Sequence, residues 1–282
     1  MNFTLLIDNS PNPKKELNNE HGISLYFEQD GYKWLLDTGN SPLFIENGKK
    51  SGINLKEIDY VVISHAHKDH TGGLGAFLEI NSKAKVYISY NILDKKYYSL
   101  RHGEKRDISP DFSVLEKHKQ RICWVNESKY ITENVAVIAQ IKTIYPTPKA
   151  NNTLIIESQG QITADNFNHE IALTINSKKG IIVFSGCAHN GLLNTIESCA
   201  NFTNNHIIKA CIGGAHLPNK TENSSYETDN EILTIAKQLK ELYKDITLYT
   251  GHCTGKHAQE LLKSILGKQV DFFYSGYSTE IK

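Results

Sequence analysis

Three histidines and an aspartate lie within six positions of the stretch SHAHKDHTGG: His65, His67, Asp69 and His70. Each imidazole needs a hydrogen-bond partner and can become charged near neutral pH, so crowding three of them is costly. Imidazole and carboxylate are also typical ligands of zinc and of redox-active divalent metals. The pattern therefore points to a metal site.

The motif follows an apolar run, DYVVIS at 59–64, that predicts a buried strand. If His65 and His67 end this strand or open a turn, their spacing of two directs both rings to one side. Asp69 and His70 can then face the same pocket from the start of the next turn. This arrangement predicts a pair of imidazoles beside a carboxylate with its own imidazole.

Two glycines, Gly72 and Gly73, come directly after the motif and lead into a helix predicted near 72–80. Because glycine has no Cβ, it lets the backbone bend sharply without a clash. We expect these glycines to allow the chain to turn away from the site.

Three later histidines each follow a predicted strand and a nearby glycine: His189 in VFSGCAHNG, His216 in CIGGAHL and His252 in LYTGHCTG. A catalytic zinc ion usually has three protein ligands and a water molecule, so one pair of histidines is not enough. A glycine before each histidine allows close backbone approach. Three such units are hard to explain by chance, and they indicate further ligands.

The remaining apolar patterns predict strands followed by strands alternating with helices in each half of the chain. The predicted strands lie at 3–8, 23–28, 32–37, 59–64, 85–89, 135–141, 153–158, 171–176, 181–186, 207–214, 246–250 and 270–275. The predicted helices lie near 42–50, 72–80, 191–203, 229–243 and 255–266. Thr228 and Glu231 can form a capping box at the start of the fourth helix. No Pro/Gly/Ser-rich linker separates the halves, so an α/β fold in one domain over 1–282 fits best.

Residues 90–132 do not fit this alternation. They are charged, with interleaved aromatic residues and little periodicity. They form either a partly helical insertion or lid over the site, or a solvated surface loop, and the sequence favours neither.

Composition narrows the class of partner. The formal net charge is zero, with no basic stripe of the kind that nucleic-acid binding requires. No apolar run approaches the roughly 20 residues of a membrane span, and the N-terminus lacks the features of a secretory signal. The five cysteines form no CxxC pair, which favours free thiols. We therefore expect a cytoplasmic protein with a small-molecule substrate, no nucleic-acid or membrane partner, and an open oligomeric state.

The motif HAHKDH resembles the HxHxDH signature of the metallo-β-lactamase fold superfamily, and the later histidines follow in the expected order. The segments EHGISLYFE, WLLDTGNS, FNHEIALTI, FSGCAHNGLLNTIE, IGGAHL and GHCTG resemble one branch of it. That branch is labelled 7,8-dihydropterin-6-methyl-4-(β-D-ribofuranosyl)aminobenzene-5′-phosphate synthase-like. The resemblance covers most of the chain and implies an αββα sandwich of two mixed sheets with outer helices.

The resemblance also implies roles for the candidate ligands. The first metal would be held by His65, His67 and His189, and the second by Asp69, His70 and His252. His216 stands where the superfamily commonly has an aspartate that bridges both metals. A neutral imidazole binds one metal through one nitrogen, so the second site should be weaker or the choice of metal different. Alternatively, His216 lies near the site without binding a metal.

Five further residues are candidates for the surroundings of the site. By resemblance, Asp37 orients a ligand histidine, because a metal-bound imidazole usually donates its other N–H to an acceptor; alternatively, it is a plain turn residue. Cys253 neighbours a ligand and is interpreted as a buried neighbour, as is Cys187. His21 and His169 lie in the motifs EHG and FNHE and are candidates for lining the pocket.

These residues favour metal-assisted hydrolysis of a small, anionic metabolite such as a phosphoester, an ester or a pterin-like compound. One or two divalent ions, zinc first and iron or manganese as alternatives, would lower the pKa of bound water and so provide hydroxide. Asp69 would orient that water or accept its proton. The alternatives are a transferase similar to the synthase branch and a mononuclear iron dioxygenase.

Overall fold

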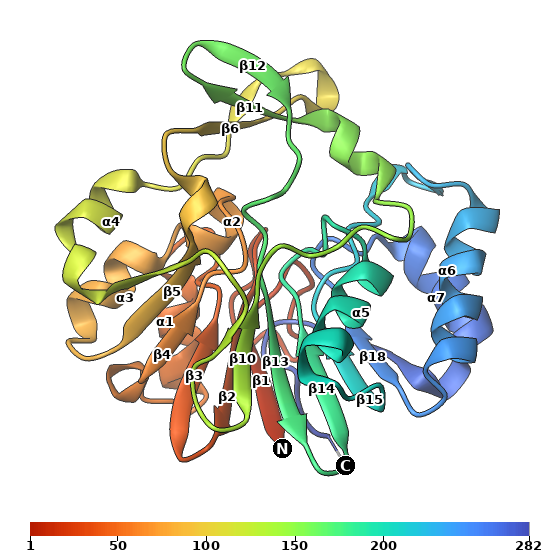
Figure 1. The fold of residues 1–282 in the computed structure, drawn as a ribbon, viewed down its shortest axis with the longest axis horizontal. Coiled ribbons are helices and arrows are strands. Elements are labelled where there is room, and N and C mark those ends of the chain that lie inside the picture. The colour runs from red at the N-terminus through yellow and green to blue at the C-terminus, as the bar shows by residue number, and fades with distance from the viewer. Residues whose placement is uncertain (282) are drawn as a thin grey trace. The chain divides into compact units, whose positions relative to one another are not determined.

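The computed structural model describes residues 1–281, so Lys282, the last residue of the predicted 1–282 domain, lies outside the described residues. The chain forms two compact units. Among the described residues, the first contains 1–126, 153–171 and 273–281, and the second contains 127–152 and 172–272. Each unit is built around its own seven-stranded sheet (Figure 1).

The sheet of the first unit has the order β20-β1-β2-β3-β4-β5-β8. Pairing is antiparallel from β20 to β3 and parallel from β3 to β8. These strands are β1 (Asn2–Ile7), β2 (Ser24–Gln29), β3 (Tyr32–Leu36), β4 (Tyr60–Val62), β5 (Lys85–Ser89), β8 (Ile122–Val125) and β20 (Ser278–Glu280). The helices of this unit are α1 (Leu43–Lys50), α2 (Lys68–Thr71), α3 (Leu74–Ile80) and α4 (Phe112–Lys117).

The sheet of the second unit has the order β19-β18-β15-β14-β13-β10-β9, parallel from β19 to β14 and antiparallel beyond. Its strands are β9 (Lys129–Tyr130), β10 (Val135–Ile138), β13 (Ala172–Ser177), β14 (Gly180–Phe184), β15 (Ile208–Ile212), β18 (Thr247–Thr250) and β19 (Val270–Phe272). The helices are α5 (Leu192–Thr203), α6 (Asp229–Leu242) and α7 (Lys256–Leu266), and a hairpin joins β16 (Asn219–Thr221) to β17 (Ser224–Ser225). Among the described residues, no helix is both long and apolar enough to cross a bilayer.

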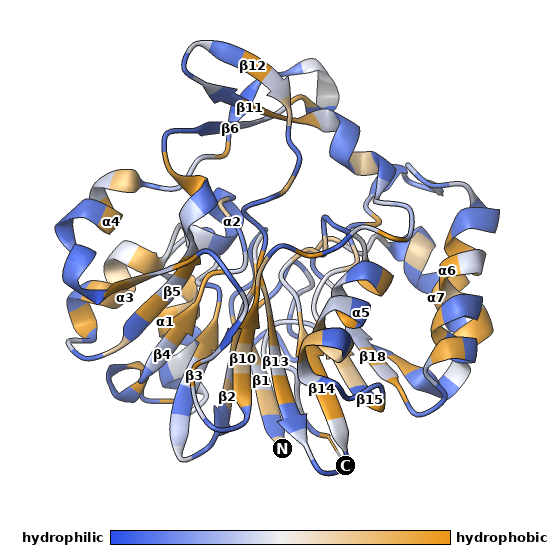
Figure 2. Cartoon of the chain, in the orientation of Figure 1, coloured by the Kyte–Doolittle hydropathy of each residue, from blue (hydrophilic) through white to orange (hydrophobic). Residues whose placement is uncertain are grey.

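The helices of the second unit bury their apolar faces in its core. On α6, Ile232, Ala236 and Leu239 are fully buried, and the predicted capping box of Thr228 and Glu231 is present. Figure 2 shows strands β14 and β15 mostly orange, whereas α6 carries both orange and blue residues. This one-sided hydropathy explains why the helical period was visible in the sequence.

The structure confirms the fold class, a mixed α/β protein with mixed sheets and helices. The strand predicted at 153–158 lies in a different sheet from the other strands of the second half. β11 (Leu154–Ser158) pairs with β6 (Lys96–Ser99) in a four-stranded sheet of the first unit, together with β7 (Arg106–Asp107) and β12 (Gln161–Ala164). Every residue of β12 is exposed, so it carries no apolar pattern that could have predicted it.

The segment 90–132 is structured and does not form one continuous loop. It contributes β6 and β7 to the small sheet, forms α4, and supplies β8 to the edge of the large sheet of the first unit. Its predicted function as a lid stays a prediction.

The glycines after the motif allow close packing, and their φ angles are ordinary. Gly72 has φ −64° and Gly73 has φ −86°, both accessible to any residue. A Cβ on Gly72 would lie 2.1 Å from the Asn40 carbonyl oxygen, and one on Gly73 would lie 2.2 Å from the Thr38 carbonyl oxygen. The glycines therefore let the segment after the motif lie directly against the chain that follows β3.

We expect Gly73→Ala to lower the free energy of unfolding by about 2 kcal/mol or more, because the new methyl group overlaps backbone. Gly75→Ala is the matched control in the same helix. Its Cβ would meet only the Val114 side chain, at 3.1 Å, so its effect should stay within about 1 kcal/mol. Urea denaturation measures both, and equal effects would contradict the close-packing explanation.

Candidate metal centre

The Asp37 carboxylate is the anchor of the motif in the first unit. It is fully buried directly after β3. Its Oδ1 accepts the Ser64 N–H at 2.7 Å, and its Oδ2 accepts the Ser64 hydroxyl at 2.7 Å and His70 Nδ1 at 2.7 Å. One carboxylate thus holds the residue before the motif and the last residue of it.

His65 and His67 form a buried pair of imidazoles. His65 Nδ1 lies 2.9 Å from the Ser64 hydroxyl, and His65 Nε2 lies 3.1 Å from His67 Nδ1. Since the hydroxyl donates to Asp37, it accepts from His65 Nδ1, which leaves Nε2 as the lone-pair nitrogen. Burial lowers the pKa of His65 well below its usual value and that of His67 to about 3. Both rings are therefore neutral at neutral pH.

Asp69 and His70 form the second part of the motif. His70 Nε2 lies 3.5 Å from Asp69 Oδ2. Burial alone would lower the pKa of His70, but the charges of Asp69 and Asp37 outweigh it and raise the pKa to about 10. His70 is thus a buried cation between two carboxylates.

His169 and Asp165 support the motif from the segment before β13. The buried His169 ring accepts the Ala66 N–H at Nδ1, 3.2 Å away, and its Nε2 lies 3.1 Å from Asp165 Oδ2. The same carboxylate oxygen lies 4.0 Å from His67 Nε2. Sequence reasoning missed Asp165, although its spacing of four from His169 was visible.

His21 lies at the rim of this cluster. Its side chain is 63% exposed, and its Nε2 lies 3.3 Å from Asp69 Oδ2. Its Nδ1 lies 3.0 Å from the Asn9 amide. It therefore contacts the motif from the solvent side.

In the second unit, three neighbouring parallel strands end at one edge of the sheet and carry the other candidates. Cys187 and His189 follow β14, His216 follows β15, and His252 follows β18. Hydrogen bonds join the three loops: Gly214 N to Gly186 O at 2.8 Å and Ala215 N to Thr254 Oγ1 at 3.0 Å. Adjacent parallel strands thus bring together residues that are far apart in sequence.

These loops contain two groups of side chains that could hold a metal ion. Possible ligand atoms of Cys187, His189 and His216 lie within 4.8 Å of one another, as do those of Cys187, His252 and Cys253. The His216 N–H donates to Cys253 Sγ at 3.2 Å. Burial raises the pKa of the Cys253 thiol, but Cys187, His216 and His252 outweigh it and lower that pKa below the usual range. Cys187, interpreted from sequence as a mere neighbour, belongs to both groups.

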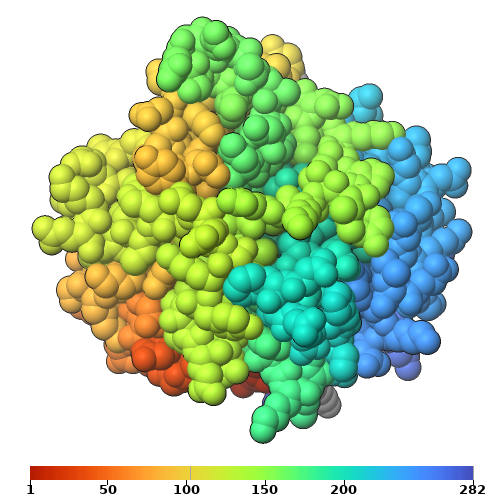
Figure 3. All heavy atoms as spheres, viewed as in Figure 1, coloured from red at the N-terminus to blue at the C-terminus, as the bar shows by residue number. Residues whose placement is uncertain are grey.

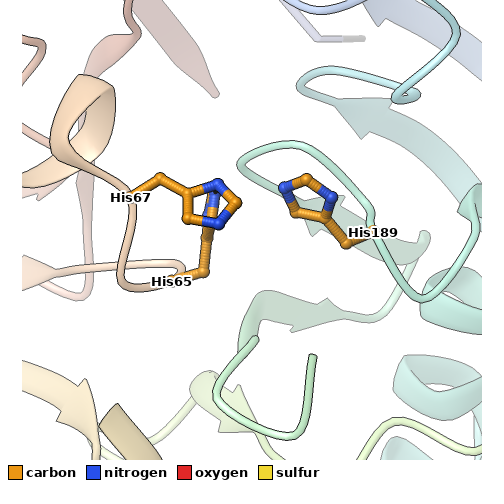
Figure 4. A group of neighbouring side chains, drawn as sticks. All are labelled: His65, His67 and His189. Carbon is orange, nitrogen blue, oxygen red and sulfur yellow. Dashed lines mark hydrogen bonds between the residues drawn. The ribbon is translucent and has the colours of Figure 1, made fainter. Parts of the chain in front are cut away.

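His189 is oriented by a residue that the sequence did not single out. Its Nδ1 lies 3.0 Å from Asn151 Oδ1, and its carbonyl accepts the Asn151 amide at 2.8 Å. Figure 4 shows His189 on the loop after β14, and His65 and His67 on the segment after β4.

Several of these residues have a left-handed backbone conformation that ordinary side chains rarely adopt. The φ angles are 57° at Asp37, 45° at His216 and 50° at His252. Such positions cost of order 1–3 kcal/mol each and cluster at functional sites. The fold therefore accepts backbone strain at three of the predicted site residues.

This arrangement of residues is similar to that of known proteins in both sequence and fold. The sequence model of the family described as "Metallo-beta-lactamase superfamily" matches residues 21–157. The crystal structure of a metal-dependent hydrolase of the beta-lactamase superfamily matches all of this chain and 99% of its own, with a TM-score of 0.81 and 28% identity. This chain is therefore similar to the metallo-beta-lactamase superfamily, in sequence over residues 21–157 and in fold over its whole length.

Two proteins of similar sequence bear on the choice of reaction. One is 7,8-dihydropterin-6-methyl-4-(beta-D-ribofuranosyl)-aminobenzene-5′-phosphate synthase of Methanocaldococcus jannaschii, 29% identical over 91% of this chain and 88% of the relative. The other is the anaerobic nitric oxide reductase flavorubredoxin of Aliivibrio fischeri, 38% identical over 28% of this chain and 16% of the relative. The first similarity is spread over the chain, whereas the second is local.

Asp37→Asn should strongly destabilise this protein in its metal-stripped form. The change removes a carboxylate charge from beside the buried His70 cation, and breaking such a pair costs about 3–5 kcal/mol. Glu79→Gln is the matched control, because Glu79 pairs with Lys117 and His118 at the surface and should matter by only about 0.5 kcal/mol. Urea denaturation at pH 7 measures both, and an equal loss would show that Asp37 does not stabilise a charged His70.

The metal-stripped protein should lose stability in acid. The pKa of His67 is about 3 in the fold and about 6.5 in an unfolded chain, so the unfolded state binds an extra proton between these values. The free energy of unfolding should fall as pH drops from 6.5 toward 3, by up to about 5 kcal/mol from this group. His67→Gln should make the dependence shallower in urea titrations at several pH values, and an unchanged slope would contradict the assignment.

Proposed function

We propose that this protein is a metal-dependent hydrolase acting on a small, anionic metabolite such as a phosphoester, an ester or a pterin-like compound. The observation that carries the proposal is the buried pair His65 and His67, held neutral beside Asp69 and His70. Neutral imidazole is the form that binds metals. Burying several imidazoles together costs desolvation free energy, and a bound metal ion would recover part of that cost.

The residues of the first unit fit a divalent ion. Two nitrogen ligands of a tetrahedral zinc ion lie about 3.3 Å apart, given bonds of about 2.0–2.1 Å. His65 Nε2 and His67 Nδ1 are separated by 3.1 Å, and His70 Nε2 and Asp69 Oδ2 by 3.5 Å. Binding at His70 would also require loss of its Nε2 proton, so uptake of an ion there should release a proton.

From the second unit, we propose His189, His216 and His252 as further ligands. This assignment rests on their order along the chain, which they share with the superfamily pattern, and on the donor groups that they form with Cys187. The proposed cofactor is one or two divalent ions, zinc first, with iron or manganese as alternatives. Because His216 replaces a bridging carboxylate, we expect the second ion to bind more weakly.

The roles of the protein groups follow from their surroundings. A bound divalent ion would supply a Lewis acid and an activated water. Asp69, whose side chain is 16% exposed, is proposed to orient that water or accept its proton. Asp37 fixes the tautomer of His70 by accepting its Nδ1–H, and Asn151 orients the His189 ring. A small-molecule partner and a cytoplasmic location remain proposals from the sequence.

A second candidate function is a synthase or transferase. It is favoured by the similarity to the M. jannaschii synthase, which extends over 91% of this chain. A mononuclear iron dioxygenase is the third candidate. Its support is weaker, because neither of the two relatives described above is a dioxygenase by name.

The double change His65→Ala with His67→Ala should abolish both metal uptake and hydrolysis, because it removes two neutral donors. Metal per chain is measured by elemental analysis, and hydrolysis with bis(p-nitrophenyl) phosphate and p-nitrophenyl acetate, with circular dichroism to confirm folding. His206→Ala, an exposed histidine of the second unit, is the control and should keep both properties. Full activity in the folded double variant would refute the proposal.

The same preparation separates the three candidates. Zinc or manganese together with hydrolysis supports the hydrolase. Iron with consumption of oxygen supports the dioxygenase. Metal binding with no hydrolysis, but with joining of a phosphorylated sugar donor to an aromatic acceptor, supports the synthase.

A further inference from the structure

A cavity of about 220 Å³ lies inside the second unit, and none of the candidate metal ligands lines it. Its walls come from residues 145–149, the start of α5, the loop after β15, and α6. Apolar side chains such as Pro146, Leu193, Leu217 and Ile235 supply most of the lining. In Figure 3 the yellow-green segment before β11 borders both the teal surface of α5 and the blue surface of α6. The cavity is large enough for one ring and smaller than the 300–1,000 Å³ typical of drug-sized ligands.

Glu227 is the unusual residue of this lining. It is only 7% exposed, and its Oε1 accepts the Lys149 N–H at 2.6 Å. Its Oε2 is buried and has no hydrogen-bond partner among the described residues. Burial raises the pKa of this carboxyl. A buried carboxylate oxygen without a partner costs free energy that a bound donor would recover.

The charged side chains next to Glu227, those of Lys149 and Glu231, form an ion pair with each other. Lys149 Nζ lies 2.6 Å from Glu231, and Glu231 also accepts the Thr228 N–H at 2.8 Å in the capping box of α6. The ammonium of Lys149 is therefore engaged by Glu231, and Glu227 has no ion-pair partner among the described residues. A cation fits such a site better than an anion or a neutral acceptor does.

We propose that this cavity is a binding site for a single-ring cation, of the arylammonium or amidinium class, whose N–H group donates to Glu227 Oε2. The ring packs against the prolines and leucines of the wall, and the charged end reaches the carboxylate. This combination of apolar walls and one convergent polar group is typical of small-molecule sites.

The site is separate from the proposed hydrolase chemistry but shares backbone with it. Neither His189 nor His216 is among the lining residues, yet Gly191 and Leu192 follow the first, and Ala215 and Leu217 flank the second. An occupied cavity would therefore brace two of the loops that carry candidate ligands. Binding can be tested on metal-stripped protein, so failure of the hydrolase proposal leaves this one intact.

The test uses benzamidine as the probe and benzamide as its uncharged counterpart, with binding measured by isothermal titration calorimetry and by NMR shifts. We expect saturable benzamidine binding, at least tenfold weaker binding of benzamide, and at least a tenfold loss, about 1.4 kcal/mol, in Glu227→Gln. Glu260→Gln makes the same change of charge at an exposed position on α7 and should bind like the wild type.

Thr234→Trp is the second variant. Thr234 lines the cavity and is itself exposed on α6. A large side chain there should fill the cavity without disturbing the core. It should also abolish binding, and it covers the case in which Glu227→Gln fails to fold. No saturable binding to the wild type, or equal binding to the Glu227→Gln and Glu260→Gln variants, would overturn the proposal. Equal binding of benzamide and benzamidine would refute the cationic ligand.

Discussion

The buried carboxylate of Asp37 is the interaction on which the histidine motif depends. It accepts hydrogen bonds from both the backbone and the hydroxyl of Ser64 and from the ring of His70. These contacts join the end of β3 to both ends of the motif. Removing one of these donors would leave the buried charge less well compensated, which costs more than a lost surface contact. The positions of His65 and His67 follow from this constraint.

Parallel strands provide the other requirement of the site. In each unit, the candidate residues follow neighbouring strands whose carboxyl ends lie at one edge of the sheet. Close packing against the chain after β3 requires glycine at positions such as Gly73, and Asp37, His216 and His252 adopt left-handed backbone conformations. These left-handed conformations cost free energy. The packed core of each unit offsets that cost, because it holds the strands from which these residues follow.

Much of the fold could be predicted from periodicity alone, because the helices α5, α6 and α7 and most large-sheet strands have one consistently apolar side. The elements that were missed lack such a pattern. β12 is exposed throughout, and β6 and β7 lie in a charged segment whose pairing with β11 depends on contacts distant in sequence. For this reason 153–158 was predicted as a strand while its sheet was not.

The sequence by itself determined the candidate ligands, since the spacing of His65, His67, Asp69 and His70 and the three strand-end histidines are local patterns. Only the tertiary structure decided their surroundings. The order of strands in the sheets determines the contacts of His169 with Asp165 and of His189 with Asn151. It also determines that Cys187 belongs to two groups of possible metal ligands. The pKa of His70 likewise depends on two carboxylates that burial brings together. Local spacing selects residue types, whereas burial and strand order determine which partners each of them meets.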